Sequence, residues 1–192
     1  MMIDIINEIK EYKPVCEQEE RDKKLILDFY DKFKLESFDR SCLAAHFSAS
    51  CWIVDETMTY VLQNYHNLYK NWGWLGGHAD GDINLLNVAL KEAKEESGLV
   101  NIRPYSNNFI SIEVLPVVPH IKHNKFVSSH LHLNVTYLFI ASMDDELHIK
   151  PDENSALKWV LLDDAVRITN EECMKPIYSK LNDYVRKIKI TK

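Results

Sequence analysis

Apolar residues in the first 42 positions recur at helical spacing and predict two helices. Ile5, Ile6 and Ile9 begin one apolar stripe. A second stripe has the same helical spacing and consists of Leu25, Ile26, Phe29, Tyr30 and Phe33. Pro14 lies between the stripes and should separate the helices, because proline breaks a helix interior. No heptad run accompanies the stripes, so we expect residues 1–42 to cap the rest of the chain, with a dimer contact as the alternative.

From about residue 45 the pattern changes to the alternation that is typical of strands. Strands are expected at His46–Val54 and Thr59–Leu62, which together would form a hairpin. Phe109–Val118 and Leu131–Ile140 are rich in β-branched and aromatic residues and predict two more strands. A last short strand is expected at Trp159–Leu162.

A helix is predicted in the middle of the chain, from Asn84 to Ser97. Asp82 or Asn84 could cap its first turn, and Gly98 could end it in the left-handed conformation. Its core-facing residues would be Leu86, Leu90 and Ala93, or Ala89.

Another helix is expected near the C-terminus, beginning at Pro176, because proline suits a first helical position. Its buried face would contain Ile177, Leu181, Tyr184 and Ile188. Strands before and after a central helix predict an α/β fold with a mixed sheet packed against helices. We expect residues 1–42 to form an N-terminal helical segment, and residues 43–192 to form one domain that includes the C-terminal helix.

The bulk composition narrows the classes of protein. The chain has 192 residues and a formal net charge of -6, which argues against a nucleic-acid polymer as the partner. An anionic small molecule remains compatible, because a metal ion could supply positive charge. The chain contains neither a long apolar run nor a signal-peptide pattern, and its four cysteines are scattered. We therefore expect reduced thiols and a cytoplasmic location.

The most informative chemistry lies in a glycine loop followed by a cluster of carboxylates. Glu92, Glu95 and Glu96 are spaced i, i+3 and i+4, so they share one helix face. Clustered like charges destabilise a helix, whereas a hard divalent ion such as Mg²⁺ or Mn²⁺ takes oxygen ligands of this kind. Gly76 and Gly77 lie one loop upstream and could bring bare backbone close to the ion or to a phosphate. The alternative is a solvated helix face.

The segment from Gly77 to Leu99 resembles the Nudix box of the Nudix hydrolases. The resemblance extends over residues 43 to about 165 and implies a Nudix-type α/β/α sandwich. Lys91 stands where the family usually has arginine, and Ile83 stands where it has its first glutamate. Asp82 is adjacent to Ile83 and could serve in place of that glutamate.

The resemblance also implies roles for individual residues. The metal ligands would be the Gly76 carbonyl and the side chains of Glu92, Glu95 and Glu96. Members of the family commonly bind more than one such ion. Lys91 would orient a glutamate, although without the bidentate geometry of arginine.

The general base is either a box glutamate or a carboxylate from a later loop. Glu153 is the leading outside candidate, ahead of Asp144, Asp145 and Glu146. An exposed loop acid without a catalytic role is the alternative for each of them.

Histidines and tryptophans are further candidates for substrate binding. His130 and His132 are two apart on a predicted strand and share a face, and His120, His123 and His78 add to this histidine-rich set. They could form a polar strand face, line the substrate pocket beside the Gly77 backbone, or bind a transition metal. A zinc site is the least favoured of these readings, because no cysteine lies nearby at ligand spacing.

Two tryptophans directly precede the glycine loop. Trp72 or Trp74 could be a pocket wall, and the alternative for both is an anchoring role in the core or a loop.

The favoured function is divalent-metal-dependent hydrolysis of a nucleoside diphosphate linked to another moiety, such as ADP-ribose, a nucleotide sugar or a modified nucleoside triphosphate. The partner would be a small nucleotide, and a homodimer is compatible. One alternative is a nucleotide-binding or regulatory module of the same fold with little catalysis. Another is an enzyme similar to isopentenyl-diphosphate isomerase, which would need an active-site cysteine. Cys51 is available, but its apolar strand indicates core packing.

Overall fold

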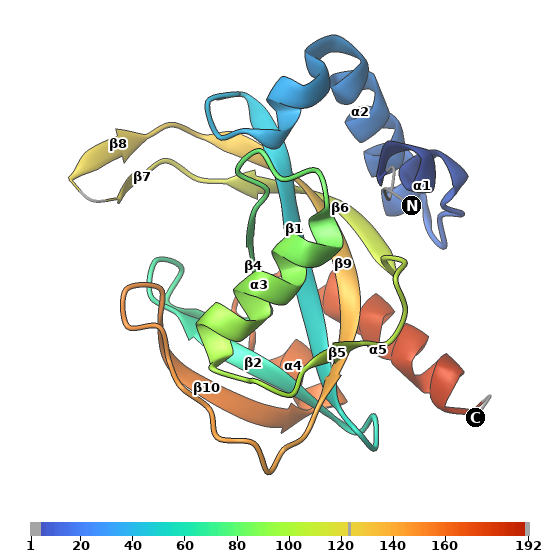
Figure 1. Ribbon diagram of the computed structural model, residues 1–192, viewed down its shortest axis with the longest axis vertical. Coiled ribbons are helices and arrows are strands. Elements are labelled where there is room, and N and C mark those ends of the chain that lie inside the picture. The colour runs from blue at the N-terminus through green and yellow to red at the C-terminus, as the bar shows by residue number, and fades with distance from the viewer. Residues whose placement is uncertain (1–4, 123, 191–192) are drawn as a thin grey trace.

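The computed structural model describes residues 5–122 and 124–190. Its N-terminal segment contains helices α1 (Ile5–Glu11) and α2 (Glu17–Phe33), followed by a short 3₁₀ helix (Lys34–Phe38) (Figure 1). The break at Pro14 and the burial of the first apolar stripe confirm the sequence prediction. In the second stripe only Ile26 is buried, because α2 lies on the domain surface against strand β6.

One mixed sheet forms the centre of the molecule. Its strands follow the order β10-β2-β1-β9-β5, with β3 beside β2, β4 beside β1 and β6 beside β9. The long strands are β1 (Ala45–Asp55), β2 (Tyr60–His66), β6 (Ser111–Val117), β9 (His130–Ala141) and β10 (Asn154–Leu161). The short ones are β3 (Asn71–Gly73), β4 (Leu75–His78) and β5 (Arg103–Pro104). Strands β1 and β9 are parallel along the whole of β1, and the other pairs are antiparallel.

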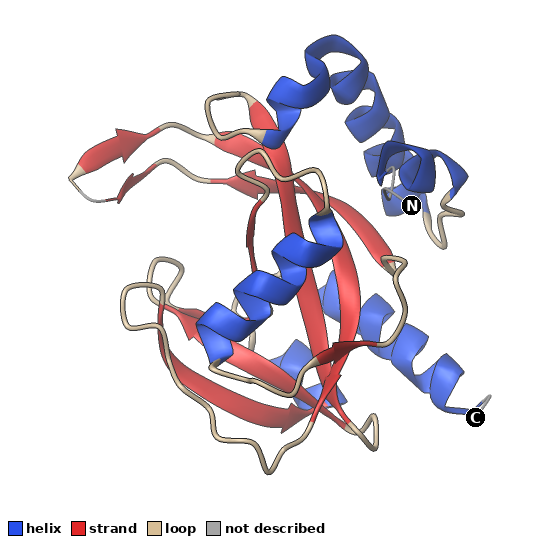
Figure 2. Cartoon of the chain, in the orientation of Figure 1, coloured by secondary structure: helices blue, strands red, loops and turns tan. Residues whose placement is uncertain are grey.

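Helices cover both faces of this sheet (Figure 2). Helix α3 (Leu85–Ser97) packs on one face, and helices α4 (Leu162–Ile168) and α5 (Met174–Ile190) pack on the other. Alternation along β1 divides the core accordingly: Cys51 and Ile53 belong to the cluster under α3, whereas Trp52 and Val54 belong to the cluster under α5. The expected α/β fold is therefore confirmed.

The central helix has the predicted ends. The Asn84 side chain accepts a hydrogen bond from the Asn87 backbone N–H and caps the first turn. Gly98 ends the helix in the left-handed conformation, with φ 72°. Of the two predicted caps, Asn84 is therefore the one used. The Asp82 carboxylate instead accepts a hydrogen bond from the backbone N–H of Asn84.

Some element boundaries differ from the sequence predictions, and some elements were not predicted. Helix α5 begins at Met174 rather than Pro176, because a proline within the first turn removes only an N–H that has no helical partner. The last strand begins at Asn154 rather than at Trp159 and ends one residue earlier than expected, because Leu162 opens helix α4. Helix α4 and a small hairpin were not anticipated; the hairpin consists of β7 (His120–Lys122) and β8 (Lys125–Val127) and projects from the body (Figure 1).

Two further observations concern the whole of the described chain. Over residues 5–122 and 124–190, none of the helices is long and apolar enough to cross a membrane. All four cysteines are free thiols.

Candidate active site

The glycine strand β4 places bare backbone beneath the central helix. Its antiparallel pairing with β1 sets Gly76 opposite Ser50 and Gly77 opposite Ala49. A Cβ at Gly76 would come within 2.6 Å of the Ala49 carbonyl oxygen, and one at Gly77 within 2.6 Å of Glu92 Oε1. Close backbone contacts therefore require glycine at position 76, whereas a side chain at position 77 would meet the Glu92 carboxylate of helix α3.

Glu96 is the most buried carboxylate of the box, with 2% of its surface exposed. It accepts a hydrogen bond of 2.9 Å from the Gly76 backbone N–H, which joins the helix to the glycine strand. Burial raises the pKa of Glu96 to about 8, although the Gly76 hydrogen bond acts in the opposite direction. Burial also raises the pKa of Glu92. A cation bound beside these two carboxyls would lower their pKa values and so favour their ionised forms.

Lys150 connects the loop before β10 to the box helix. Its Nζ atom lies 3.2 Å from a carboxylate oxygen of Glu95 and 3.2 Å from one of Glu153. Burial lowers the pKa of Lys150, but the hydrogen bonds to these two carboxylates outweigh that effect and raise it to about 12. The Asn154 side chain also donates a 2.9 Å hydrogen bond to the Glu96 carbonyl oxygen. These contacts bring Glu153, the candidate base from outside the box, to the carboxylate cluster.

The two departures from the box have clear positions in the structure. Ile83 packs against the hydrophobic core, and the adjacent Asp82 is exposed, with its carboxylate on the Asn84 backbone N–H. Lys91 is exposed, and its Nζ lies 3.8 Å from Glu95 Oε1. Lys150 therefore approaches Glu95 more closely than Lys91 does.

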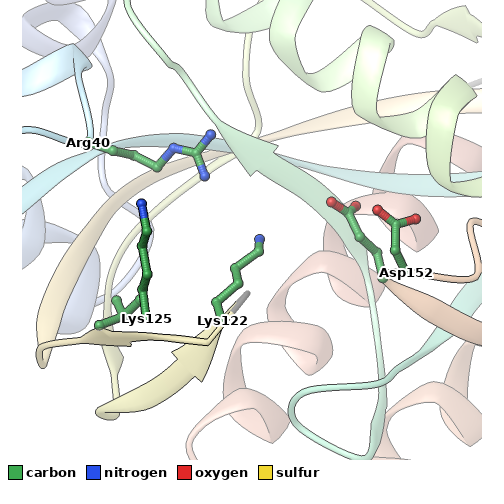
Figure 3. A pocket seen from close by; sticks show the side chains of 6 residues that line it. Arg40, Lys122, Lys125 and Asp152 are labelled. Carbon is green, nitrogen blue, oxygen red and sulfur yellow. The ribbon is translucent and has the colours of Figure 1, made fainter.

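A cavity of about 500 Å³ adjoins this cluster. Figure 3 shows Arg40, Lys122 and Lys125 on one side of it and Asp152 on the other. Glu153 and Val127 complete the lining. The three basic residues were not predicted because they come from the turn before β1 and from the unanticipated hairpin. The close spacing of Lys122 and Lys125 is the only signal that the sequence carries for them.

The structure gathers four histidines from three strands. The predicted residues His78, His130 and His132 lie together with His46 of β1, which the sequence placed only as a strand residue. His120 lies on the hairpin strand β7 and is not one of the four, and the predicted His123 lies outside the described residues. Burial lowers the pKa of His78 to about 2 and that of His132 to about 3, with neighbouring histidines adding to the effect.

Trp74 is partly buried against the core, and Cys51 lies within it. Trp74 packs edge-on against Tyr178 of α5 at a ring distance of 5.5 Å, and its backbone N–H bonds to the Tyr178 hydroxyl. It therefore contacts the α5 side of the sheet, opposite to α3, and is not brought to the cavity. Cys51 is fully buried, and its thiol donates to the Leu75 carbonyl oxygen. Burial raises the pKa of this thiol well above its usual range, as expected for a core residue.

Comparisons with known proteins identify a matching family model and solved structures of similar fold. Residues 44–181 match the model of the NUDIX domain. A C. elegans Ap4A hydrolase in a binary complex has 18% sequence identity and a TM-score of 0.55, and the match covers 73% of this chain and 97% of that one. A hydrolase of the NUDIX family from Clostridium perfringens has 22% identity and a TM-score of 0.53, with coverage of 73% and 97%. The E. coli dihydroneopterin triphosphate pyrophosphohydrolase has 14% identity and a TM-score of 0.52, with coverage of 70% and 92%. No curated protein matches the sequence significantly.

Proposed function

The chain belongs to the Nudix hydrolase family, whose members cleave diphosphate bonds, and we propose that it hydrolyses a nucleoside diphosphate linked to another moiety with the help of a divalent metal ion. One observation carries this proposal: the three box carboxylates and Glu153 lie close together beside a cavity. The opposite side of that cavity is lined by basic residues. Substrates of this class include ADP-ribose, nucleotide sugars and modified nucleoside triphosphates. The names of two structural relatives add dinucleoside polyphosphates and dihydroneopterin triphosphate to the compounds worth testing.

The donor set fits Mg²⁺ or Mn²⁺. Glu92, Glu95 and Glu96 offer hard oxygen ligands, and the Gly76 carbonyl offers another. In the described structure, Lys150 is the only cation within hydrogen-bonding distance of these carboxylates and Glu153, so the cluster retains negative charge. The ion would polarise a phosphoryl group and lower the pKa of a bound water.

Protein groups on both sides of the cavity would complete the site. Arg40, Lys122 and Lys125 are placed to bind phosphate oxygens, and Arg40 is held in position by two hydrogen bonds to Asp80. Glu153 would accept the proton of the attacking water, with Lys150 keeping its carboxylate oriented toward the box. Lys91 would assist in orienting Glu95 from the surface.

The N-terminal segment, residues 1–42, would act as a cap on a catalytic domain formed by residues 43–192. The Gln18 side chain donates a hydrogen bond to the Ile112 carbonyl oxygen of β6, and Glu19 pairs with Lys180 of α5. These contacts support a fixed position of the cap on the domain.

The proposal is tested by assaying hydrolysis of the compounds above with Mg²⁺ or Mn²⁺, for the wild type and for Glu96→Gln. We expect turnover that disappears on chelation and falls by orders of magnitude in the variant, because the amide is a poorer metal ligand. Glu56→Gln, an exposed change in the turn after β1, is the matched control and should retain activity. Equal activity in Glu96→Gln and wild type would overturn the assignment.

A nucleotide-binding module with little catalysis is the second candidate. It is favoured by Ile83, an apolar residue packed against the core where the box has its first glutamate, and by the position of Lys150 among the carboxylates. Absence of turnover, together with metal-dependent increases in melting temperature on nucleotide addition, would identify this function.

A further inference from the structure

His46, His78, His130 and His132 lie on three adjacent strands and share one face of the sheet. His46 of β1 and His132 of β9 are direct partners in the parallel pair, and His130 precedes His132 by two residues on the same face. Strand β4 pairs with the other edge of β1 and sets His78 opposite Ser48, two residues beyond His46. The sheet thus brings together four imidazoles that are far apart in the sequence.

The ring nitrogens are close enough to share one ion. One nitrogen from each histidine can be chosen so that all four lie within 4.8 Å of one another. The Nε2 atoms of His78 and His132 are 3.1 Å apart, and those of His130 and His132 are 3.3 Å apart. A tetrahedral zinc site, with Zn–N bonds of about 2.0–2.1 Å, has nitrogens roughly 3.3 Å apart. The Nε2 separations of 3.1 and 3.3 Å are close to this value, and the more widely spaced nitrogens, which lie within 4.8 Å of one another, would draw together around the ion.

Carbonyl oxygens fix the orientation of two of the rings. His46 Nδ1 lies 3.2 Å from the Cys42 carbonyl, and His130 Nδ1 lies 2.8 Å from the Ser128 carbonyl. Because a carbonyl oxygen can only accept, each Nδ1 carries the hydrogen, and the neutral ring presents a lone pair at Nε2. This carbonyl–histidine arrangement is the one that orients metal-binding imidazoles.

Hydrogen bonds among the rings do not satisfy the cluster. His46 Nε2 is buried and has no hydrogen-bond partner among the described residues. His132 Nε2 faces the Nε2 atoms of both His78 and His130. A ring nitrogen has either one N–H or one lone pair, so it can form a full hydrogen bond with only one of these two neighbours. A cation at the centre would accept the lone pairs of all four rings.

The charge around the cluster allows a cation. Arg40 and Lys122 lie nearby, and the pairing of Arg40 with Asp80 through two hydrogen bonds of 2.5 and 2.7 Å reduces the repulsion between Arg40 and a bound ion. Imidazole ligands suit Zn²⁺, Co²⁺, Ni²⁺ and Cu²⁺, whereas Mg²⁺ prefers oxygen. We propose that His46, His78, His130 and His132 bind one transition-metal ion, with Zn²⁺ the best fit, at a site separate from the carboxylate cluster. The ion joins the ends of β1, β4 and β9.

The test uses the full chain without a histidine tag, stripped of metal and titrated with Co²⁺. We expect one tetrahedral Co²⁺ ion per chain, seen by its visible absorption, which Zn²⁺ displaces and Mg²⁺ does not. Zn²⁺ should also raise the melting temperature of the wild type.

His132→Ala should weaken Co²⁺ binding at least roughly 100-fold, since even outer-shell changes cost about 10–100-fold. His148→Ala, a change at an exposed histidine outside the cluster, is the matched control and should bind as the wild type does. His130→Gln serves as the second variant, with circular dichroism showing that each variant is folded. No tetrahedral band in the wild type, or unchanged affinity in a folded cluster variant, would overturn the proposal.

The test of the histidine site can be separated from the test of the proposed hydrolysis. Glu96→Gln should retain the Co²⁺ band while losing hydrolysis, because its carboxylate is not one of the four ligands. Loss of the band in Glu96→Gln would contradict a separate site.

Discussion

The Glu92 carboxylate of helix α3 lies directly against the α-carbon of Gly77 in strand β4. Any Cβ at Gly77 would come within 2.6 Å of Glu92 Oε1. The same strand donates the Gly76 N–H to Glu96. The glycine pair therefore determines how closely the box carboxylates approach the strand backbone.

Gly77→Ala should displace the Glu92 side chain while leaving the fold intact. The new methyl group would meet only the flexible end of Glu92, which is half-buried and can rotate toward solvent. We expect a loss of roughly 10–100-fold in divalent-metal affinity, the range for disturbed ligand orientation. Isothermal titration with Mn²⁺ measures this loss.

Gly73→Ala is the control for this change, since its Cβ would meet only the Tyr178 hydroxyl, at 3.1 Å. A double-mutant cycle with Glu92→Ala adds a second check. Removing the displaced side chain should abolish any stability cost of Gly77→Ala. If the effects of the two substitutions on stability were simply additive, the proposed contact between residue 77 and Glu92 would be contradicted.

Lys150 should stabilise the metal-free protein more than the metal-bound one. Lys150→Met removes the cation between Glu95 and Glu153, so we expect a loss of about 1 kcal/mol in unfolding free energy in the presence of a chelator, because these ion pairs are partly exposed. Saturating Mg²⁺ should recover most of this loss, because the ion replaces the missing positive charge. Urea unfolding with and without Mg²⁺ measures both quantities, and Lys94→Met, an exposed change on α3, is the control. An equal loss in both conditions would show that Lys150 acts independently of the metal site.

The lysines of the hairpin should determine substrate affinity rather than the chemical step. Lys122→Gln combined with Lys125→Gln removes two cations that face the cavity. We expect KM to rise roughly tenfold, which corresponds to about 1.4 kcal/mol, with kcat nearly unchanged. Steady-state kinetics on the best substrate measures the two constants, and Lys24→Gln on α2 is the control. A fall in kcat at constant KM would contradict a role in phosphate binding.

The sequence predicted the box helix well because its signals are local. Asn84 and Gly98 mark the two ends, and the carboxylate spacing lies within the helix itself. The burial of Glu96 and the contact of Glu92 with Gly77 were not predictable, because they depend on the pairing of β4 with β1.

The four-histidine cluster shows where local reasoning ends. His130 and His132 share a face by alternation alone, but their contact with His46 depends on the register of the parallel β1–β9 pair. A register that differed by one residue would place His46 on the opposite face. Lys150 was missed for a related reason: its loop folds back onto α3 through Asn154, a contact between residues far apart in the sequence.

Lys180 of α5 forms the centre of a buried ion cluster that joins three elements. Its Nζ lies 2.7 Å from Glu19 of α2 and 3.2 Å from Glu113 of β6, and both carboxylates are fully buried. Ser111, Asn134 and Thr136 donate further hydrogen bonds to Glu113. Burial raises the pKa of Glu113 above its ordinary value of 4.5, and Lys180 opposes that shift.

Lys180→Met should destabilise the protein by about 3–5 kcal/mol near neutral pH, because two buried carboxylates lose their cation. The pKa of Glu113 would then rise further. A carboxyl with a raised folded-state pKa binds more protons when folded, so stability falls as pH rises from the ordinary value of 4.5 toward the folded-state pKa. The deficit of the variant should therefore be small at about pH 5 and larger at about pH 8. Urea unfolding at both pH values measures it, with Lys175→Met, at a surface ion pair of α5, as a control that changes little. A deficit that did not depend on pH would show that the lost cation is not what destabilises the variant.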